Sequence, residues 1–174
     1  ADPLSGLRTA GGAGVGEEGG RAVDAVVVDA YDVFLRFDDA ASALKPELIV
    51  RFGAMPVSKP LLQYLERWVD VPQVVVDEGG GWRDPTLAAA AMWHVDPAWL
   101  CRAVLEALPA GAGATPRRRR GGALPDWAGL WRELNEATRS ALRQALQEQA
   151  GMFEGRIFHE LAELLPAGAA LYVG

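Results

Sequence analysis

Two basic side chains stand where an α/β protein could bind an anion. Lys59 closes the loop "FGAMPVSK", which follows an apolar run at 47–52, and Arg83 lies in "DEGGGWRD", which follows a second run at 73–77. Each loop leads into a segment that we expect to be helical, and the free N–H groups of a first helical turn favour anions. Carboxylates or phosphates are therefore the ligands that these two positions predict.

The position of Lys59 is electrostatically unusual. A helix should begin near Pro60, and the N-terminal end of a helix carries a partial positive charge that disfavours cations. An anion bound between Lys59 and this helix would reverse the penalty. The alternative is a solvated surface lysine, because the local cost of such a position is only a few tenths of a kcal/mol, roughly. For Arg83 the alternative is that it braces the turn Gly79–Gly81 against Asp84.

Alternating strands and helices are predicted to position these loops. The segments 46–53, 72–81 and 91–95 are short apolar runs typical of buried strands, and a helix is expected at 59–68 with Leu61, Leu62, Leu65 and Trp68 on one side. Such alternation indicates βαβ units and a parallel sheet. Because ligands bind beyond the C-terminal ends of parallel strands, both loops are expected on the binding side of the sheet.

Further helices are indicated by capping patterns and amphipathic periodicity. Asp84 and Pro85 predict a helix start, as do Asp96 and Pro97. The segment 22–37 is ambiguous, and its second half favours a helix. The remaining predictions are a helix at 126–150 capped by Asp126, a helix at 153–168 and a strand at 169–173.

The composition restricts the function classes. The chain has 174 residues, a net charge of -6, 50% hydrophobic residues and one cysteine. This is a globular composition, and the acidic balance argues against a general nucleic-acid binder. The run Arg117–Arg120 lies in a Gly/Pro-rich linker at 109–125 and is expected to be solvated; the alternative is contact with nucleic acid or an acidic partner. The segment 5–22 is Gly-rich and without hydrophobic period, which predicts a loop; the alternative is a phosphate-binding loop, but no GxxxxGK(S/T) motif occurs in it.

No other residue type is arranged for catalysis. Cys101 has no disulfide partner and is expected to be a buried, inert thiol. His94 and His159 are expected to be packing or surface residues, and no metal-ligand spacing or Ser/His/Asp order occurs. The tryptophans are expected to be core or domain-interface anchors: Trp82, Trp93, Trp99, Trp127 and Trp131.

The sequence also leads to expectations about the cellular compartment and about whether the chain is part of a longer protein. No stretch reaches the ~18 apolar residues of a membrane span, and no signal peptide is present at the N-terminus, so a cytoplasmic protein with no membrane partner is expected. The sequence begins without Met and ends in an apolar run at 170–173 followed by Gly174. We expect from this that the chain is a fragment of a longer protein.

Five stretches carry a family resemblance: "ADPLSGLR", "YDVFLR", "IVRFGAMPVSKPLLQYLE", "VVVDEGGGWRDPT" and "GRIFHELAELLPAGAALYVG". They resemble the thiamine-diphosphate-dependent 2-succinyl-5-enolpyruvyl-6-hydroxy-3-cyclohexene-1-carboxylate synthases of menaquinone biosynthesis. The resemblance implies a Rossmann-like α/β fold, with a parallel sheet flanked by helices. It implies a middle domain at 1–124, a connecting helix at 125–150 and the start of a third domain at 151–174. Family strands expected before residue 1 are missing, which implies an incomplete sheet with an open, apolar edge.

The resemblance also implies an activity for the full-length protein. Family members use thiamine diphosphate with Mg²⁺ or Mn²⁺, and they join 2-oxoglutarate to isochorismate as homodimers or homotetramers. It implies that cofactor, metal and catalytic glutamate belong to segments outside this chain, so the chain alone is expected to be inactive. Lys59 is implied to bind substrate, and Arg83 is a weaker second residue. A regulatory or structural ligand-binding domain is the alternative function.

Overall fold

The computed structural model describes residues 27–108, 126–149, 151, 153–166 and 169. By its internal contacts the chain divides into two compact units, residues 1–135 and 136–174. Three of the predicted features fall outside the described residues: the Gly-rich segment at 5–22, the arginine-containing linker at 109–125 and most of the strand at 169–173. The domain boundaries implied by the resemblance stay predictions.

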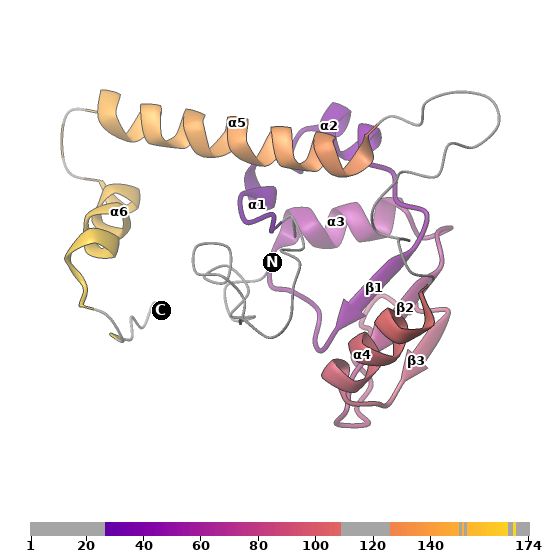
Figure 1. Cartoon of the computed structure of the whole chain (residues 1–174). Coiled ribbons are helices and arrows are strands. Elements are labelled where there is room, and N and C mark those ends of the chain that lie inside the picture. The colour runs from indigo at the N-terminus through magenta and orange to yellow at the C-terminus, as the bar shows by residue number, and fades with distance from the viewer. Residues whose placement is uncertain (1–26, 109–125, 150, 152, 167–168, 170–174) are drawn as a thin grey trace. The chain divides into compact units, whose positions relative to one another are not determined.

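A parallel sheet forms the centre of the first unit (Figure 1). Its strands are β1 (Ile49–Phe52), β2 (Gln73–Val76) and β3 (Ala91–Trp93), in the order β1-β2-β3. The register places Phe52 of β1 beside Val76 of β2, and Val76 beside Trp93 of β3. Helices flank this sheet, so the predicted Rossmann-like α/β class is confirmed.

The burial of the strands shows where the core lies. Val75 and Val76 point to opposite faces of β2 and are both completely buried, so the central strand is covered on both sides. On β1 burial alternates, and Val50 and Phe52 are exposed. Within the described part of the chain β1 pairs only with β2. One face of β1 therefore presents exposed apolar side chains, while the incomplete sheet that the resemblance implies stays a prediction.

Three helices build the core beside β1. They are α1 (Tyr31–Phe34), α2 (Asp38–Ala43) and α3 (Lys59–Arg67), and α1 confirms the predicted helix in the second half of 22–37. The predicted apolar side of α3 is correct for Leu61, Leu65 and Trp68, which pack in or against the core. It also includes Tyr64, whose hydroxyl donates to the carbonyl oxygen of Leu44 at 2.6 Å. Burial raises the pKa of the Tyr64 phenol.

The remaining helices are α4 (Pro97–Ala107), α5 (Trp127–Glu148) and α6 (Glu154–Leu164). The predicted caps of two of them are confirmed: Asp96 accepts from the Trp99 amide, and Asp126 accepts from the Gly129 amide at 2.8 Å. No helix in the described part of the chain combines the length and the apolar character that a bilayer crossing requires.

One prediction about burial is wrong, and a second is met only in part. Cys101 is exposed, and so it is not the buried thiol that the sequence predicts; it lies on α4, which carries no buried residue. Four of the tryptophans are exposed and are not core residues: Trp82, Trp93, Trp99 and Trp127. Their role at a domain interface stays a prediction. Trp131 does pack against the core, with its ring edge-to-face to Phe34 and Tyr64 at centroid distances of 5.6 and 5.9 Å.

Asn135 links α5 by hydrogen bonds to the backbone segment directly before α1. Its side-chain oxygen accepts from the backbone amides of Asp29 at 3.1 Å and Ala30 at 2.9 Å. We expect Asn135→Ala to lower the free energy of unfolding by about 1–3 kcal/mol, because it leaves buried backbone donors without their acceptor. Urea unfolding of the chain measures this. Asn135→Asp keeps the acceptor oxygen and should recover most of the loss; an equal loss in both variants would contradict the role of this oxygen.

Candidate anion site at the C-terminal edge of the sheet

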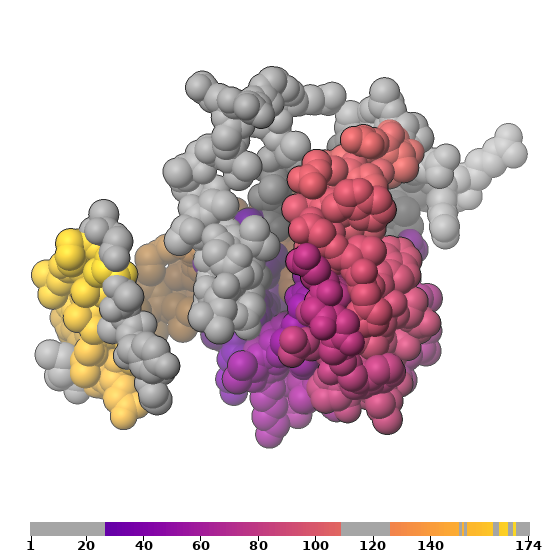
Figure 2. All heavy atoms as spheres, turned by 90° about the horizontal axis from the view of Figure 1, so that it is seen from below, coloured from indigo at the N-terminus to yellow at the C-terminus, as the bar shows by residue number. Residues whose placement is uncertain are grey.

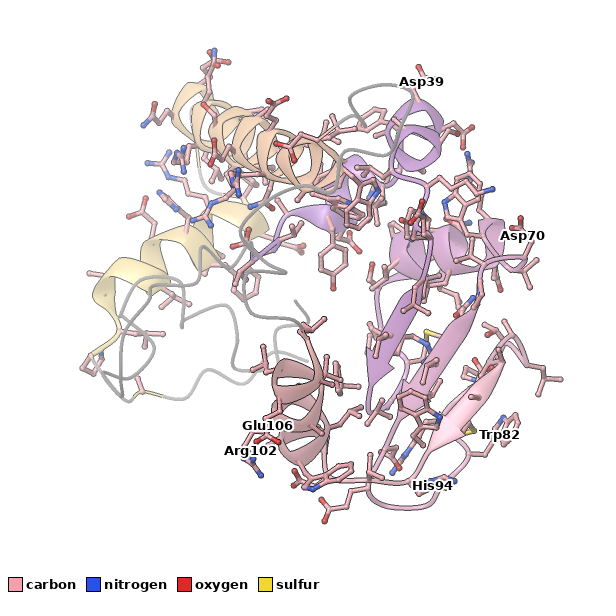
Figure 3. The ribbon with its side chains drawn as sticks, turned by 45° about the vertical axis from the view of Figure 1, so that its right-hand side comes forward. Asp39, Asp70, Trp82, His94, Arg102 and Glu106 are labelled. Atoms are coloured by element: carbon pink, nitrogen blue, oxygen red, sulfur yellow. The ribbon has the colours of Figure 1, made fainter. Side chains whose placement is uncertain are left out.

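The C-terminal ends of the three strands lie side by side, and their loops leave from this common edge. The Gly53 amide donates to the Val76 carbonyl at 2.8 Å, and the Asp77 amide donates to the Trp93 carbonyl at 3.0 Å. The His94 ring nitrogen Nδ1 lies 3.3 Å from the Asp77 carbonyl oxygen. Figure 3 shows Trp82 and His94 at this edge, and Figure 2 views the unit from the side toward which the strands point. The sheet therefore gathers the loops that carry both predicted residues.

Lys59 is exposed at the first position of α3. It makes no hydrogen bond or ion pair with any residue that the structure describes. Val57, two residues earlier, is 94% exposed, so the end of this loop projects from the unit. The ammonium group is thus accessible to an anion, and its role in substrate binding stays a prediction.

Ser58 is the N-cap of α3 and links it to α1. Its hydroxyl oxygen accepts from the Leu61 amide at 3.2 Å and donates to Oδ1 of Asp32 at 2.6 Å. The hydrogen bonds from Ser58 and then Arg36 lower the pKa of the Asp32 carboxyl, against a smaller opposing effect of burial. Asp32 is therefore an anion held next to the N-terminal end of the helix that carries Lys59.

Arg83 lies over the glycine turn, but its acidic partner is not the predicted one. Its Nε is 3.4 Å from Oδ2 of Asp77, and its guanidinium is within 4.0 Å of the place where a Cβ on Gly79 or Gly81 would stand. Asp84 instead pairs with Arg51. The alternative in which Arg83 braces the turn against Asp84 is thus wrong, while the substrate-binding role of Arg83 stays a prediction.

Asp84 does not start a helix, and this prediction is also wrong. Its buried carboxylate accepts from the Thr86 hydroxyl and the Ala89 amide, each at 2.7 Å, so it closes a turn over 85–87. Nη2 of Arg51 donates to the same carboxylate at 2.8 Å, and Nη1 donates to the Arg83 carbonyl at 3.3 Å. The pair Arg51–Asp84 therefore anchors the loop that follows β2, which carries Arg83, to β1.

The ionisation of this pair reflects competing effects. Burial raises the pKa of the Asp84 carboxyl, but the hydrogen bonds from Thr86 and Ala89 and the charge of Arg51 together outweigh burial, so its pKa is lowered. Burial also lowers the pKa of Arg51, and the charge of Asp84 and the hydrogen bond to it oppose this. Both groups are charged at neutral pH, and each depends on the other inside the protein.

Two neighbouring glycines of this turn are expected to differ in their tolerance of a side chain. Gly80 has φ +66°, in the left-handed region of backbone conformation where a residue with a Cβ is strained. Gly81 lies outside the left-handed region, and a Cβ added there would meet Arg83 only at ordinary van der Waals distance. We expect Gly80→Ala to cost about 1–2 kcal/mol of unfolding free energy, and Gly81→Ala to be within about 1 kcal/mol of the parent chain. Thermal unfolding of the two variants compares them; equal losses would contradict this assignment.

Sequence reasoning missed three residues at this edge: Asp32, Arg51 and Ser58. Ser58 carried a usable signal, because a serine directly before a helix start is a common N-cap. Asp32 and Arg51 carried none, since their partners lie 26 and 33 residues away. The structure joins Lys59 to Asp32 through Ser58, but no described contact joins Lys59 to Arg83.

A separate cavity of about 490 Å³ runs along the unpaired side of β1. Its lining is mostly apolar and aromatic, including Tyr31, Tyr64, Trp127 and Trp131, and neither Lys59 nor Arg83 contributes to it. Among the described residues no group of three His, Cys, Asp or Glu side chains could hold a metal ion.

Comparison with known proteins gives a consistent result. The chain matches no protein-family model. Over its full length it is 46% identical to a 2-succinyl-5-enolpyruvyl-6-hydroxy-3-cyclohexene-1-carboxylate synthase of Geobacillus kaustophilus, and it covers 26% of that protein. The same-named proteins of Chloroflexus aurantiacus and Listeria monocytogenes are 39% and 36% identical, with 27% of each covered.

The chain thus spans about a quarter of the length of the curated relatives that it matches. The match includes every residue of the chain, and it is well above the level at which only a fold is shared. Over its whole length the chain is therefore homologous to a segment of the 2-succinyl-5-enolpyruvyl-6-hydroxy-3-cyclohexene-1-carboxylate synthase family, and the resemblance that its motifs predict is confirmed.

Proposed function

We propose that the chain is part of a 2-succinyl-5-enolpyruvyl-6-hydroxy-3-cyclohexene-1-carboxylate synthase of menaquinone biosynthesis. The full-length protein would decarboxylate 2-oxoglutarate and add the remaining four-carbon unit to isochorismate, as a homodimer or homotetramer in the cytoplasm. The observation that carries this proposal is the similarity over all 174 residues to proteins of that name.

Within this reaction the chain would contribute substrate binding. Both proposed substrates carry carboxylates, and such groups are held by charge-assisted hydrogen bonds from cations. Lys59 is exposed, has no ionic partner among the described residues and stands at the edge where parallel strands bind ligands. Arg83 is the weaker proposal, because it is already engaged with Asp77.

Among the residues that the structure describes, no group of three His, Cys, Asp or Glu side chains could hold a metal ion. We propose that other segments of the full-length protein bind thiamine diphosphate and Mg²⁺ or Mn²⁺, and that the 174-residue chain alone has no synthase activity.

An assay of the full-length protein tests this proposal. With thiamine diphosphate, Mg²⁺, 2-oxoglutarate and isochorismate present, we expect consumption of isochorismate and release of one carbon dioxide per product formed. Omission of either substrate or of thiamine diphosphate should abolish product formation. Full-length protein that is folded and oligomeric but forms no product from these substrates would overturn the proposed reaction.

A ligand-binding regulatory role is the second candidate, favoured by the apolar cavity along β1. Its volume of about 490 Å³ is in the range of small-molecule sites. This role predicts a ligand that changes the rate of the full-length enzyme while Lys59→Ala leaves ligand affinity unchanged, because Lys59 does not line the cavity. Calorimetric titration with aromatic and apolar metabolites would identify such a ligand.

A further inference from the structure

We propose that Asp32 is the positioning residue for Lys59: its carboxylate holds the N-cap of α3 and supplies the negative charge that this helix start lacks. The inference deepens the proposed function, because its effect on substrate affinity rests on the role of Lys59. Its structural half, the fixing of the α3 start, is independent of any activity.

The hydrogen bonds fix the geometry of the cap. A serine hydroxyl has one hydrogen, and the hydroxyl of Ser58 directs it to Oδ1 of Asp32 at 2.6 Å. The lone pairs of the same oxygen are then turned toward the Leu61 amide, which donates to it at 3.2 Å. Asp32 thereby holds the hydroxyl in an orientation in which its oxygen caps the helix, and this fixes the backbone from which Lys59 extends.

The charges explain how Lys59 is tolerated at its position. The first turn of α3 contains no acidic residue, and Lys59 itself occupies the first helical position. An anion near a helix N-terminus is stabilising, whichever segment provides it. Asp32, brought from α1 through tertiary structure, provides this anion next to the helix start.

Asp32 is itself held in place by Arg36. The Arg36 guanidinium donates to Oδ2 of Asp32 at 2.7 Å and, through Nε, to the Asp32 carbonyl at 2.9 Å. The Asp32 carboxylate is therefore held in place by Arg36, whereas Lys59 makes no ion pair with a described residue. As a result Lys59 keeps its positive charge available for an incoming carboxylate.

Steady-state kinetics of the full-length protein test the positioning role. We expect Asp32→Ala to raise the KM of a carboxylate substrate about tenfold, with kcat changed less than twofold, since a charge-assisted hydrogen bond is lost. Asp32→Asn keeps an acceptor for the Ser58 hydroxyl, so it should raise KM less than Asp32→Ala does. In the Lys59→Ala background, Asp32→Ala should have no further effect on KM. The exposed Asp39 gives the matched control, Asp39→Asn, which should behave as the parent protein (Figure 3).

Amide hydrogen exchange of the 174-residue chain tests the structural half without any substrate. Because Leu61 donates to Ser58, exchange of its amide should become about tenfold faster in Asp32→Ala and Ser58→Ala. Asp39→Asn should leave it unchanged. Unchanged exchange at Leu61 in Asp32→Ala would overturn the inference whatever the kinetics show.

The kinetic outcomes separate this inference from the proposed function. If Asp32→Ala raises KM equally with and without Lys59, or lowers only kcat, Asp32 acts on the fold or the chemistry and the positioning role is overturned. If Lys59→Ala alone is indistinguishable from the parent protein, the substrate role of Lys59 fails, and the positioning role fails with it. If the parent protein has no activity, the proposed reaction fails and the exchange experiment decides whether Asp32 fixes the start of α3.

Discussion

Asp84→Asn is expected to lower the free energy of unfolding of the chain by about 3–5 kcal/mol, the usual cost of removing one partner of a buried ion pair. Asp84 is completely buried, and its partner Arg51 is only 7% exposed. Without the carboxylate, Arg51 remains charged inside the protein, and the single side-chain oxygen of asparagine cannot replace both the oxygen that accepts from Arg51 and the oxygen that accepts from the Ala89 amide.

Urea unfolding of the parent chain and of the variants Asp84→Asn and Asp70→Asn measures this effect. The matched control is Asp70→Asn, since Asp70 forms an exposed pair with Lys45 at 3.7 Å (Figure 3). Such exposed pairs contribute about 0–1 kcal/mol. Losses of similar size in the two variants would contradict the account of Asp84 as an anchor for the loop that follows β2.

The same carboxylate predicts a pH dependence. The pKa of Asp84 is lower in the folded chain than its ordinary value, so the folded state binds this proton less tightly than the unfolded state does. The contribution of Asp84 to stability is therefore complete above the ordinary carboxyl pKa, and it is lost as the pH falls through the lowered pKa. Asp84→Asn should flatten the acid side of the stability profile relative to Asp70→Asn.

Lys59→Ala is expected to raise the KM of at least one substrate of the full-length protein roughly 10- to 150-fold. This corresponds to the loss of about 1.5–3 kcal/mol from a hydrogen bond to a charged group. Turnover at saturating substrate should change far less, because an anion held equally in the ground and transition states affects affinity and not kcat.

Two further variants make this result specific. Lys59→Arg keeps the charge and should recover part of the affinity, although the planar guanidinium differs in shape from an ammonium. Lys45→Ala removes the other lysine of this chain, which lies over Trp68 and near Asp70, and should leave both KM values unchanged. Equal KM values in Lys59→Ala and the parent protein would make Lys59 a solvated surface lysine.

Local sequence patterns correctly predicted those parts of the fold that depend only on residues close together in the sequence. The apolar runs gave β1 and β2, and the alternation of strands and helices gave the parallel sheet. Asp126 was correctly identified as the cap of α5, since its partner Gly129 is only three residues away. These features depend on neighbours in the sequence, which is why periodicity and capping rules were sufficient.

The Asp-Pro pairs at 84–85 and 96–97 show where such rules fail. Asp96 caps α4 as predicted, whereas Asp84 closes a turn and forms no helix. The difference comes from Arg51, which lies 33 residues away on β1 and draws the Asp84 carboxylate into the protein. No local pattern contains that partner, so the same dipeptide has two outcomes in one chain.

The candidate site was predicted only in part, because some of its contacts join residues far apart in the sequence. The place of Lys59 at a helix start beyond a strand followed from its own segment. The carboxylate next to this helix start did not, because Asp32 reaches it only through the packing of α1 beside α3. Sequence alone thus indicated a cation with an unfavourable local position, and the tertiary structure supplies the acid that offsets it.

Chemical modification of Lys59 in the full-length protein tests the central claim most directly. The rate of acetylation of Lys59 is measured by peptide mass spectrometry without substrate and with saturating 2-oxoglutarate or isochorismate alone, with Lys45 as the internal reference. The account predicts that one of these substrates slows the modification of Lys59 at least tenfold, roughly, and leaves that of Lys45 unchanged. Modification of Lys59 at the same rate with and without each saturating substrate would contradict it.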